Sequence, residues 1–351
     1  MKELYQQIFN TIEQEHEQYK NLTLNSRVLI VDGLNNFIRI WVENPTTNDD
    51  GQHVGGIVGF LFTLGVVIRA TRPTRLFVVL DGKDSSSRRK KIFPQYKENR
   101  GAGTRLNRAY KWADEEEERK QMQYQMLRTI KYLKNLPVTF VMLDNIEADD
   151  SIAYLTEIFK QKEEMKELFI SSTDKDFYQL LDDRVKIWHP IKKEVYGAQK
   201  VEELFGVQPH NFLLFKSIVG DKSDNIPGIK GLGPKTISKC FDILKEERKI
   251  TPDDLLQHSE NHRNDGRAYN LLADNRNQYL MNYRLMNLSS TNIPNSSRLK
   301  IVSLVNQKVN EINLVNIQEL VKEDKLWGSF KNINDWVLSN FLTLNAFAKT
   351  S

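Results

Sequence analysis

The chain has 351 residues, of which 40% are hydrophobic and 27% charged, with a net charge of +4. These values are ordinary for a soluble globular protein of one large or two smaller domains. The single cysteine, Cys240, excludes an intramolecular disulfide and indicates a reducing compartment, so we expect a cytoplasmic protein. The N-terminus does not resemble a signal peptide, and the uncharged run 54–68 is too short to span a bilayer. We interpret that run as a buried helix.

In chain order, an amphipathic helix is expected first, because Leu4, Ile8 and Ile12 recur every four residues within residues 1–22. Four short apolar runs follow, each closed by acidic residues. They are 27–31 before Asp32, 76–80 before Asp81, 138–143 before Asp144 and Glu147, and 168–173 before Asp174. Such runs, separated by helix-length segments, predict buried parallel strands of an α/β fold. Sites in these sheets form beyond the carboxyl ends of the strands, so the acids should converge at one edge.

Carboxylates are the most informative residues of the chain. The set that we single out is Asp32, Asp81, Glu147, Asp149, Asp150, Asp174, Asp176, Asp221 and Asp224. Oxygen ligands without histidine or cysteine select hard ions, so we predict two Mg²⁺ ions, replaceable by Mn²⁺, that promote hydrolysis of a phosphodiester. Each acid alone has a simpler interpretation as a turn residue, an N-cap or a first-turn acid. Their common position after apolar runs favours the metal site.

A basic segment, defined here as residues 83–111, lies between the second and third apolar runs. It holds ten basic and two acidic residues, a local charge of +8, with Phe93, Tyr96 and Tyr110 interleaved and Trp112 just beyond. Positive charge alternating with aromatic rings is typical of surfaces that bind single-stranded nucleic acid. A solvated charged face or a flexible loop is the alternative interpretation. Beyond residue 200 the pattern becomes helical.

A glycine-rich turn, residues 228–236, follows Asp221 and Asp224. It is not a P-loop, because Pro234 separates Gly233 from Lys235. Two helices joined by a tight turn at Gly231 and Gly233 fit better, with backbone N–H groups, Lys230 and Lys235 facing a phosphate. Such an element holds a duplex backbone without reading its sequence. A plain Gly-Pro turn is the alternative.

These motifs, in this order, resemble the flap endonucleases and 5′-nucleases, especially the stand-alone bacteriophage enzymes. The matching stretches are 30–33, 81–83, 96–100, 147–150, 172–176 and 220–236. The resemblance implies a PIN-like α/β nuclease core with a mainly parallel sheet, a helical arch and a helix–three-turn–helix element. We therefore expect an N-terminal helical extension (1–25), a core (26–200) with an arch at about 84–125, a helical DNA-binding region (201–299) and a C-terminal helical extension (300–351).

The resemblance also implies roles for individual residues. Asp32, Asp81, Glu147, Asp149 and Asp150 match the first metal cluster, and Asp174, Asp176, Asp221 and Asp224 match the second. Lys97 and Arg100 match the residues that reach the scissile phosphate, and with Asp149 they form the expected catalytic group. The expected DNA contacts are Lys83, Arg88, Arg89, Lys90, Tyr96, Lys97, Arg100, Lys230, Gly231, Gly233, Lys235 and Thr236. A potassium ion on the carbonyls of the glycine-rich turn is a further expectation.

The implied activity is removal of 5′ flaps and RNA primers from branched DNA and RNA–DNA hybrid, by a monomer, in replication and repair. A single-strand-binding protein or a sliding clamp is the candidate partner, although no clear clamp-binding peptide is present. A non-catalytic junction-binding protein of the same fold would have gaps in the carboxylate set, and none is found. A PIN-like ribonuclease for single strands would lack the glycine-rich turn. A phosphotransferase with Asp32 as nucleophile would need Asp-x-Asp after the first strand.

Overall fold

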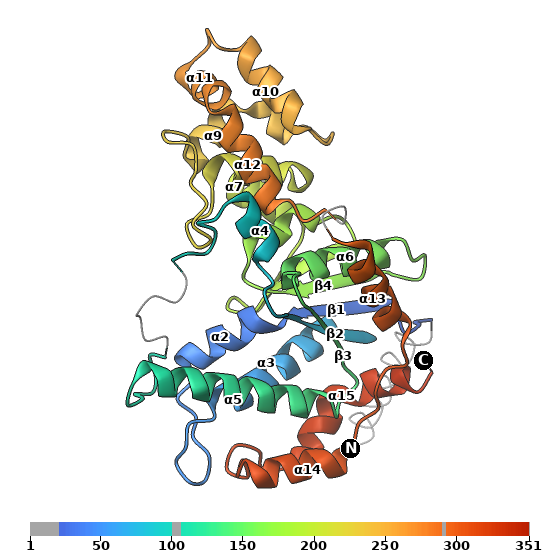
Figure 1. Cartoon of the computed structure of the whole chain (residues 1–351). Coiled ribbons are helices and arrows are strands. Elements are labelled where there is room, and N and C mark those ends of the chain that lie inside the picture. Colours follow the sequence, from blue (N-terminus) through green and yellow to red (C-terminus); the bar gives the residue numbers. More distant parts are fainter. Residues whose placement is uncertain (1–20, 100–106, 290–292, 351) are drawn as a thin grey trace, which may run out of the picture.

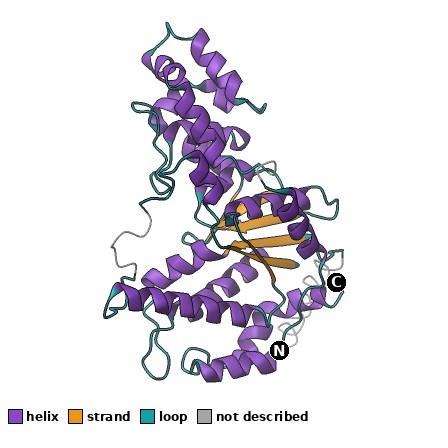
Figure 2. Cartoon of the chain, viewed as in Figure 1, coloured by secondary structure: helices purple, strands orange, loops and turns teal. Residues whose placement is uncertain are grey.

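A six-stranded sheet forms the centre of the protein (Figures 1 and 2). The computed structural model describes residues 21–99, 107–289 and 293–350, so most of the predicted N-terminal helix, as well as Arg100, lies outside the described residues. The strands are β1 (Arg27–Asp32), β2 (Arg75–Asp81), β3 (Thr139–Leu143), β4 (Glu167–Ser171), β5 (Val185–His189) and β6 (Glu194–Tyr196). Their order is β3-β2-β1-β4-β5-β6, and only the β5–β6 pair is antiparallel.

The four apolar runs correspond to β1 to β4, which are parallel neighbours, so this prediction is confirmed. Both faces of β1 are buried, and side chains alternate between them. Val28 and Ile30 pack in a core that includes helix α6 (Ala148–Lys160). Leu29 and Val31 pack in a second core with helix α3 (Gly55–Thr71), which is the predicted buried helix. Burial on both faces explains the continuous apolar runs.

The second core is closed by further helices on the same face of the sheet (Figure 1). These are α2 (Gly33–Glu43), α5 (Glu115–Leu133), α14 (Leu314–Glu323) and α15 (Ile333–Ala348). The predicted arch extended to residue 125, whereas α5 begins at Glu115 and packs along α3. Apolar side chains on one stripe of α5, such as Tyr132 and Leu133, draw it onto the core.

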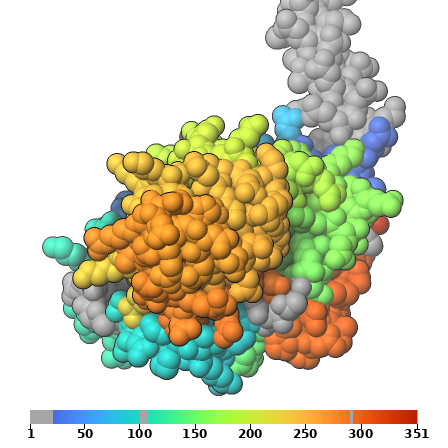
Figure 3. All heavy atoms as spheres, turned by 90° about the horizontal axis from the view of Figure 1, so that it is seen from above, coloured from blue at the N-terminus to red at the C-terminus, as the bar shows by residue number. Residues whose placement is uncertain are grey.

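A helical region rises from the carboxyl ends of the strands (Figure 1). It comprises α7 (Ala198–Phe205), α8 (Phe212–Val219), α9 (Pro234–Cys240), α10 (Pro252–Asn261), α11 (Arg267–Asp274) and α12 (Arg276–Met286), with the short 3₁₀ turns Pro209–Asn211 and Asp242–Lys245. Helix α4 (Ser87–Ile92), from the basic segment, packs against α12. Viewed from above, the α4 segment lies along the edge of these helices (Figure 3). The chain then returns to the sheet as α13 (Asn295–Asn306).

Candidate active site

Acidic side chains gather where the parallel strands end. Asp32 is the last residue of β1 and caps helix α2, because its carboxylate accepts a hydrogen bond from the Asn35 backbone at 3.3 Å. Asp81 ends the neighbouring β2, and its carboxylate accepts from the Ala148 backbone at 3.0 Å. This bond joins Asp81 to the start of α6, where Asp149 occupies the first turn. The cap and first-turn interpretations of these acids are therefore correct, and they bring the acids together.

Asp32, Asp149 and Asp174 repel one another at this edge. Burial raises the pKa of Asp32 to about 7, against a hydrogen bond from Ser172, and the negative charges of Asp174 and Asp81 add to the increase. Burial also raises the pKa of Asp149, and Asp174 and Asp32 raise it further. A carboxylate that is both desolvated and close to like charges needs either a proton or a cation.

A lysine that we did not predict holds two of the other acids. Lys216, on α8, lies 2.6 Å from Asp221 and also donates to Asp176, which sits in the 3₁₀ helix Lys175–Leu180 after β4. Burial raises the pKa of Asp176 to about 7 although Lys216 opposes the increase. Burial would also raise the pKa of Asp221, but Lys216 and hydrogen bonds from Ser223 lower it to about 2.

Arg89 holds the remaining acids of α6. Its guanidinium donates to both oxygens of Asp150, at 2.7 and 3.0 Å, and lies 2.9 Å from Glu147. Lys97 lies 2.9 Å from the other oxygen of Glu147, and Tyr96 donates to Glu147 at 3.1 Å. Arg89 and Tyr96 are 3% and 2% exposed. Both side chains point into the protein here, and their predicted role in contacting DNA stays a prediction.

In their present conformations, the acidic side chains are not arranged to coordinate a metal ion. In the described ranges, no group of three or more histidine, cysteine, aspartate or glutamate side chains is arranged to hold an ion. Protein cations bind Glu147, Asp150, Asp176 and Asp221. Asp32, Asp149 and Asp174 remain mutually repelling. This all-oxygen donor set suits hard divalent cations, which would replace the ammonium and guanidinium groups.

The glycine-rich turn lies between α8 and α9 and faces outward. Gly231 has a backbone φ of +94°, which favours glycine, and Lys230, Gly233 and Lys235 are exposed around it. Asp221 and Ile226 form a bridge just before the turn. The structure therefore places the predicted duplex-binding residues at the surface and joins them to the carboxylate Asp221.

The basic segment meets this loop at Lys97. The Lys97 backbone N–H donates to the carbonyl of Asp224 at 2.9 Å, and Tyr96 donates to the Asp224 carboxylate at 2.8 Å. Around α4, Lys83 and Lys90 are exposed and Arg88 is half-buried beside Asp150. Part of the segment is thus anchored among the acids, and part remains available to an anionic ligand.

Comparison with known families agrees with this arrangement. The profile described as "5'-3' exonuclease, N-terminal resolvase-like domain" matches residues 27–206. The profile described as "5'-3' exonuclease, C-terminal SAM fold" matches residues 207–309. The chain belongs to the 5′-3′ exonuclease family. The first profile takes in the whole sheet, and the second takes in α8 to α12 with the glycine-rich turn, so the predicted resemblance is confirmed.

Relatives of this exonuclease-family chain are bacterial enzymes. A 5′-3′ exonuclease of Aquifex aeolicus is 34% identical over 202 residues, which are 58% of this chain and 63% of the relative. The flap endonuclease Xni of Shewanella sp. strain MR-4 is 31% identical over 216 residues, 62% of this chain and 75% of the relative. Both are nucleases that hydrolyse nucleic acid, and so is this family member. A phage origin stays a prediction.

Solved structures share the fold. A bacteriophage T5 flap endonuclease, in a pseudo-enzyme–product complex with DNA and metal ions, has a TM-score of 0.59 at 20% identity and covers 85% of this chain and 99% of its own. The T5 5′-exonuclease with bound zinc has a TM-score of 0.60 at 20% identity and covers 85% and 98%. The predicted PIN-like core joined to a helical region is confirmed at the level of the fold.

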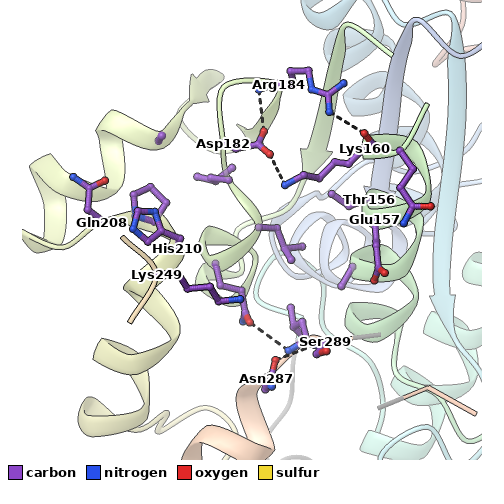
Figure 4. Close-up of a pocket in the computed structure, with 18 of the residues that line it drawn as sticks. Thr156, Glu157, Lys160, Asp182, Arg184, Gln208, His210, Lys249, Asn287 and Ser289 are labelled. Atoms are coloured by element: carbon purple, nitrogen blue, oxygen red, sulfur yellow. Dashed lines mark hydrogen bonds and ion pairs between the residues drawn. The ribbon is translucent and has the colours of Figure 1, made fainter. Parts of the chain in front are cut away.

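A cavity of about 680 Å³ lies elsewhere on this nuclease, between the core and the helical region (Figure 4). Lys160 pairs with Asp182, and Arg184 donates to main-chain carbonyls, so these charges are satisfied within the protein. None of the predicted metal carboxylates lines the cavity. The cavity is therefore separate from the predicted metal site. Separately, none of the described helices is long and apolar enough to cross a membrane.

Proposed function

We propose that this nuclease is a structure-specific 5′-nuclease that cuts 5′ flaps and removes RNA primers from branched DNA and RNA–DNA hybrid. The convergence of Asp32, Asp149 and Asp174 at the carboxyl edge of the sheet carries the proposal. Asp32 is buried, Asp149 and Asp174 are half-buried, and the three repel one another, which a protein tolerates where cations or reacting groups compensate. We expect a cytoplasmic monomer that acts in replication and repair, with a single-strand-binding protein or a clamp as partner.

Two Mg²⁺ ions, replaceable by Mn²⁺, fit this set of oxygen donors. Asp32, Asp81 and Asp149 would hold the first ion, with Glu147 and Asp150 once these two leave Arg89. Asp174 and Asp224 would hold the second, with Asp176 and Asp221 once these two leave Lys216. When bound, such ions supply an activated nucleophile and stabilise the charge on the leaving oxygen.

Lys97 is the residue best placed to act on the substrate. Its backbone is left-handed, with φ of +58°, and its ammonium group lies 2.9 Å from Glu147. Its side chain is 17% exposed, so the ammonium group borders both the acids and the solvent. We propose that Lys97, with Arg100 from outside the described residues, neutralises charge that develops on the scissile phosphate.

The glycine-rich turn would hold the duplex behind the cut. Backbone N–H groups at Gly231 and Gly233, together with Lys230 and Lys235, can contact consecutive phosphates without reading bases. Thr236 follows on α9, and a potassium ion on the carbonyls of the turn would add to the grip. Lys83, Arg88 and Lys90 would guide the 5′ single strand along the basic segment.

Cleavage of a 5′-labelled flap tests this function. Wild-type protein should release short labelled fragments with Mg²⁺ and none with EDTA, and the partner product should carry a 5′-phosphate. Asp149→Asn should abolish cleavage. Asp144→Asn is the matched control, since Asp144 also follows β3 but is exposed and accepts a hydrogen bond from the Lys83 backbone. Tight flap binding without cleavage by wild-type protein would instead show a non-catalytic junction-binding protein.

A further inference from the structure

The last two helices of the chain lie outside the matched family domains, which end at residue 309. They nevertheless belong to the core. Val321 of α14 and Val337 of α15 are fully buried with the side chains of α3 and α5, and Leu326 and Phe330 in the connection between them are buried as well. Figure 1 shows α14 and α15 on the face of the sheet that α3 and α5 cover. This C-terminal pair therefore supports elements that the family domains supply.

Asp324, just after α14, makes the main polar contacts between the C-terminal pair and α5. It is 5% exposed, and its carboxylate accepts from Arg128 at 2.8 Å and from Tyr132 at 2.9 Å. Tyr124 adds a longer bond at 3.4 Å. All three donors lie on α5. A buried carboxylate that binds three donors on one helix fixes where that helix lies.

The turn after α14, residues 324–328, also holds the connection between α2 and α3, residues 44–54. Asn48 donates to the Asp324 carbonyl at 3.1 Å, and the Asp49 backbone donates to the Lys325 carbonyl at 3.0 Å. The Gly328 backbone donates to the Asp49 carboxylate at 3.1 Å. Asp324 and its neighbours thus fasten two separate elements of the core, one through side chains and one through the backbone.

The basic segment, where its described part resumes at Asn107, is held by α5 and by the end of α2, the helix that runs into the 44–54 connection. The Asn107 backbone donates to Glu118 of α5 at 2.7 Å, and its side chain donates to the Trp41 carbonyl of α2 at 2.6 Å. The Arg108 backbone donates to the Val42 carbonyl at 2.9 Å. Hydrogen bonds therefore join the turn after α14 to α5, and other hydrogen bonds join α5 and the end of α2 to the downstream end of the basic segment.

We propose that Asp324 is a positioning residue for the 5′ single strand. By fixing α5 and the 44–54 connection, it sets the place at which the basic segment rejoins the core, and hence the path open to a flap. The proposal rests on the flap-cutting function proposed above. The Asp324 carboxylate binds α5 and not the acids at the strand ends, so its replacement should impair cleavage of flapped substrates more than cleavage of flapless ones.

Two substrates and two variants test this role. The substrates are a duplex with a long 5′ flap and the same duplex with a recessed, flapless 5′ end, each assayed for kcat and KM. Asp324→Asn should lower kcat/KM on the flap by about 2- to 30-fold, mainly through KM, the range for residues that act through a packed network. Cleavage of the flapless end should stay within about twofold of wild type. Glu323→Gln is the matched control, because Glu323 also binds Arg128 but its side chain is 62% exposed.

Equal losses on the two substrates would show general damage and overturn the proposal, as would an unchanged flap reaction. If Asp324→Asn does not fold, the double variant Tyr124→Phe and Tyr132→Phe removes two donors while it keeps both rings. The same selective loss is then expected, and an unselective one overturns the proposal. Wild-type protein that cuts neither substrate would instead overturn the proposed nuclease function, and this role with it.

Discussion

The ammonium nitrogen of Lys216 lies 2.6 Å from Oδ2 of Asp221. Because Asp176 binds the same ammonium group, one protein cation serves two acids of the proposed second metal set. Asp176 and Asp174 also repel each other. A lysine inside the protein thus carries the charge that compensates these two acids.

Replacement of this lysine should make folding depend on metal. Lys216→Met leaves Asp176 and Asp221 without their cation, and loss of one partner of a buried pair lowers the free energy of unfolding by about 3–5 kcal/mol. In urea titrations with EDTA, we expect a loss of this size. Mg²⁺ should restore more stability to Lys216→Met than to wild type, since the ion replaces the missing charge. Lys200→Met is the control, because the side chain of Lys200 is 38% exposed and pairs with Glu203 away from these acids. Equal gains from Mg²⁺ in both proteins would contradict this account.

The stability of the metal-free protein should fall between pH 4 and pH 8. The folded-state pKa of Asp32, about 7, lies above its ordinary value of 3.8, because burial and nearby acids favour the protonated form. The resulting stabilisation is complete below pH 4 and is lost as the pH rises through 7, on the order of 4 kcal/mol. Urea unfolding in EDTA at several pH values measures it. The difference between wild type and Asp32→Asn isolates this group, and a difference that does not change with pH would refute the raised pKa.

Arg89 should matter for stability and not for DNA binding. Arg89→Met leaves Glu147 and Asp150 buried without their main partner, so we expect a loss of about 3–5 kcal/mol in urea unfolding. Lys90→Met, next along α4 and exposed, should stay within about 0.5 kcal/mol of wild type. In EDTA, where Arg89 keeps its pairs with Glu147 and Asp150, DNA affinity should fall in the Lys90 variant and not in the folded Arg89 variant. The reverse pattern would restore Arg89 as a DNA contact.

The sequence was most informative where burial and chemistry coincide. The strands were predictable because a parallel strand buried on both faces is apolar throughout, and the acid at its end stands out against that run. Asp32 and Asp81 are of this kind. Nothing in the sequence indicated that Arg89 turns inward, since it is one of ten basic residues in the segment. The burial of Tyr96 was equally hidden, because an aromatic ring among basic residues suits both stacking and burial.

Lys216 was missed for a different reason. It lies in an apolar stretch of α8, five residues before Asp221, and only the packing of α8 against the 3₁₀ helix Lys175–Leu180 brings it to Asp176. Long-range pairing of this kind is set by the fold and leaves no local pattern. The packing of α5 on α3 likewise left no local pattern, because four acids fill the first turn of this helix.

The glycine-rich turn should contribute two positive charges to duplex binding, and the salt dependence of the affinity should report their number. Lys230→Ala with Lys235→Ala removes two exposed ammonium groups that we expect to contact phosphates. Each lost contact should reduce the slope of log affinity against log salt by about 0.9, and so by about 2 in the double variant. Affinity should fall similarly for duplexes of different sequence, because these contacts read no bases. Lys245→Ala, at an exposed lysine paired with Asp242, should leave the slope unchanged. A slope unaltered in the double variant would show that the duplex binds elsewhere.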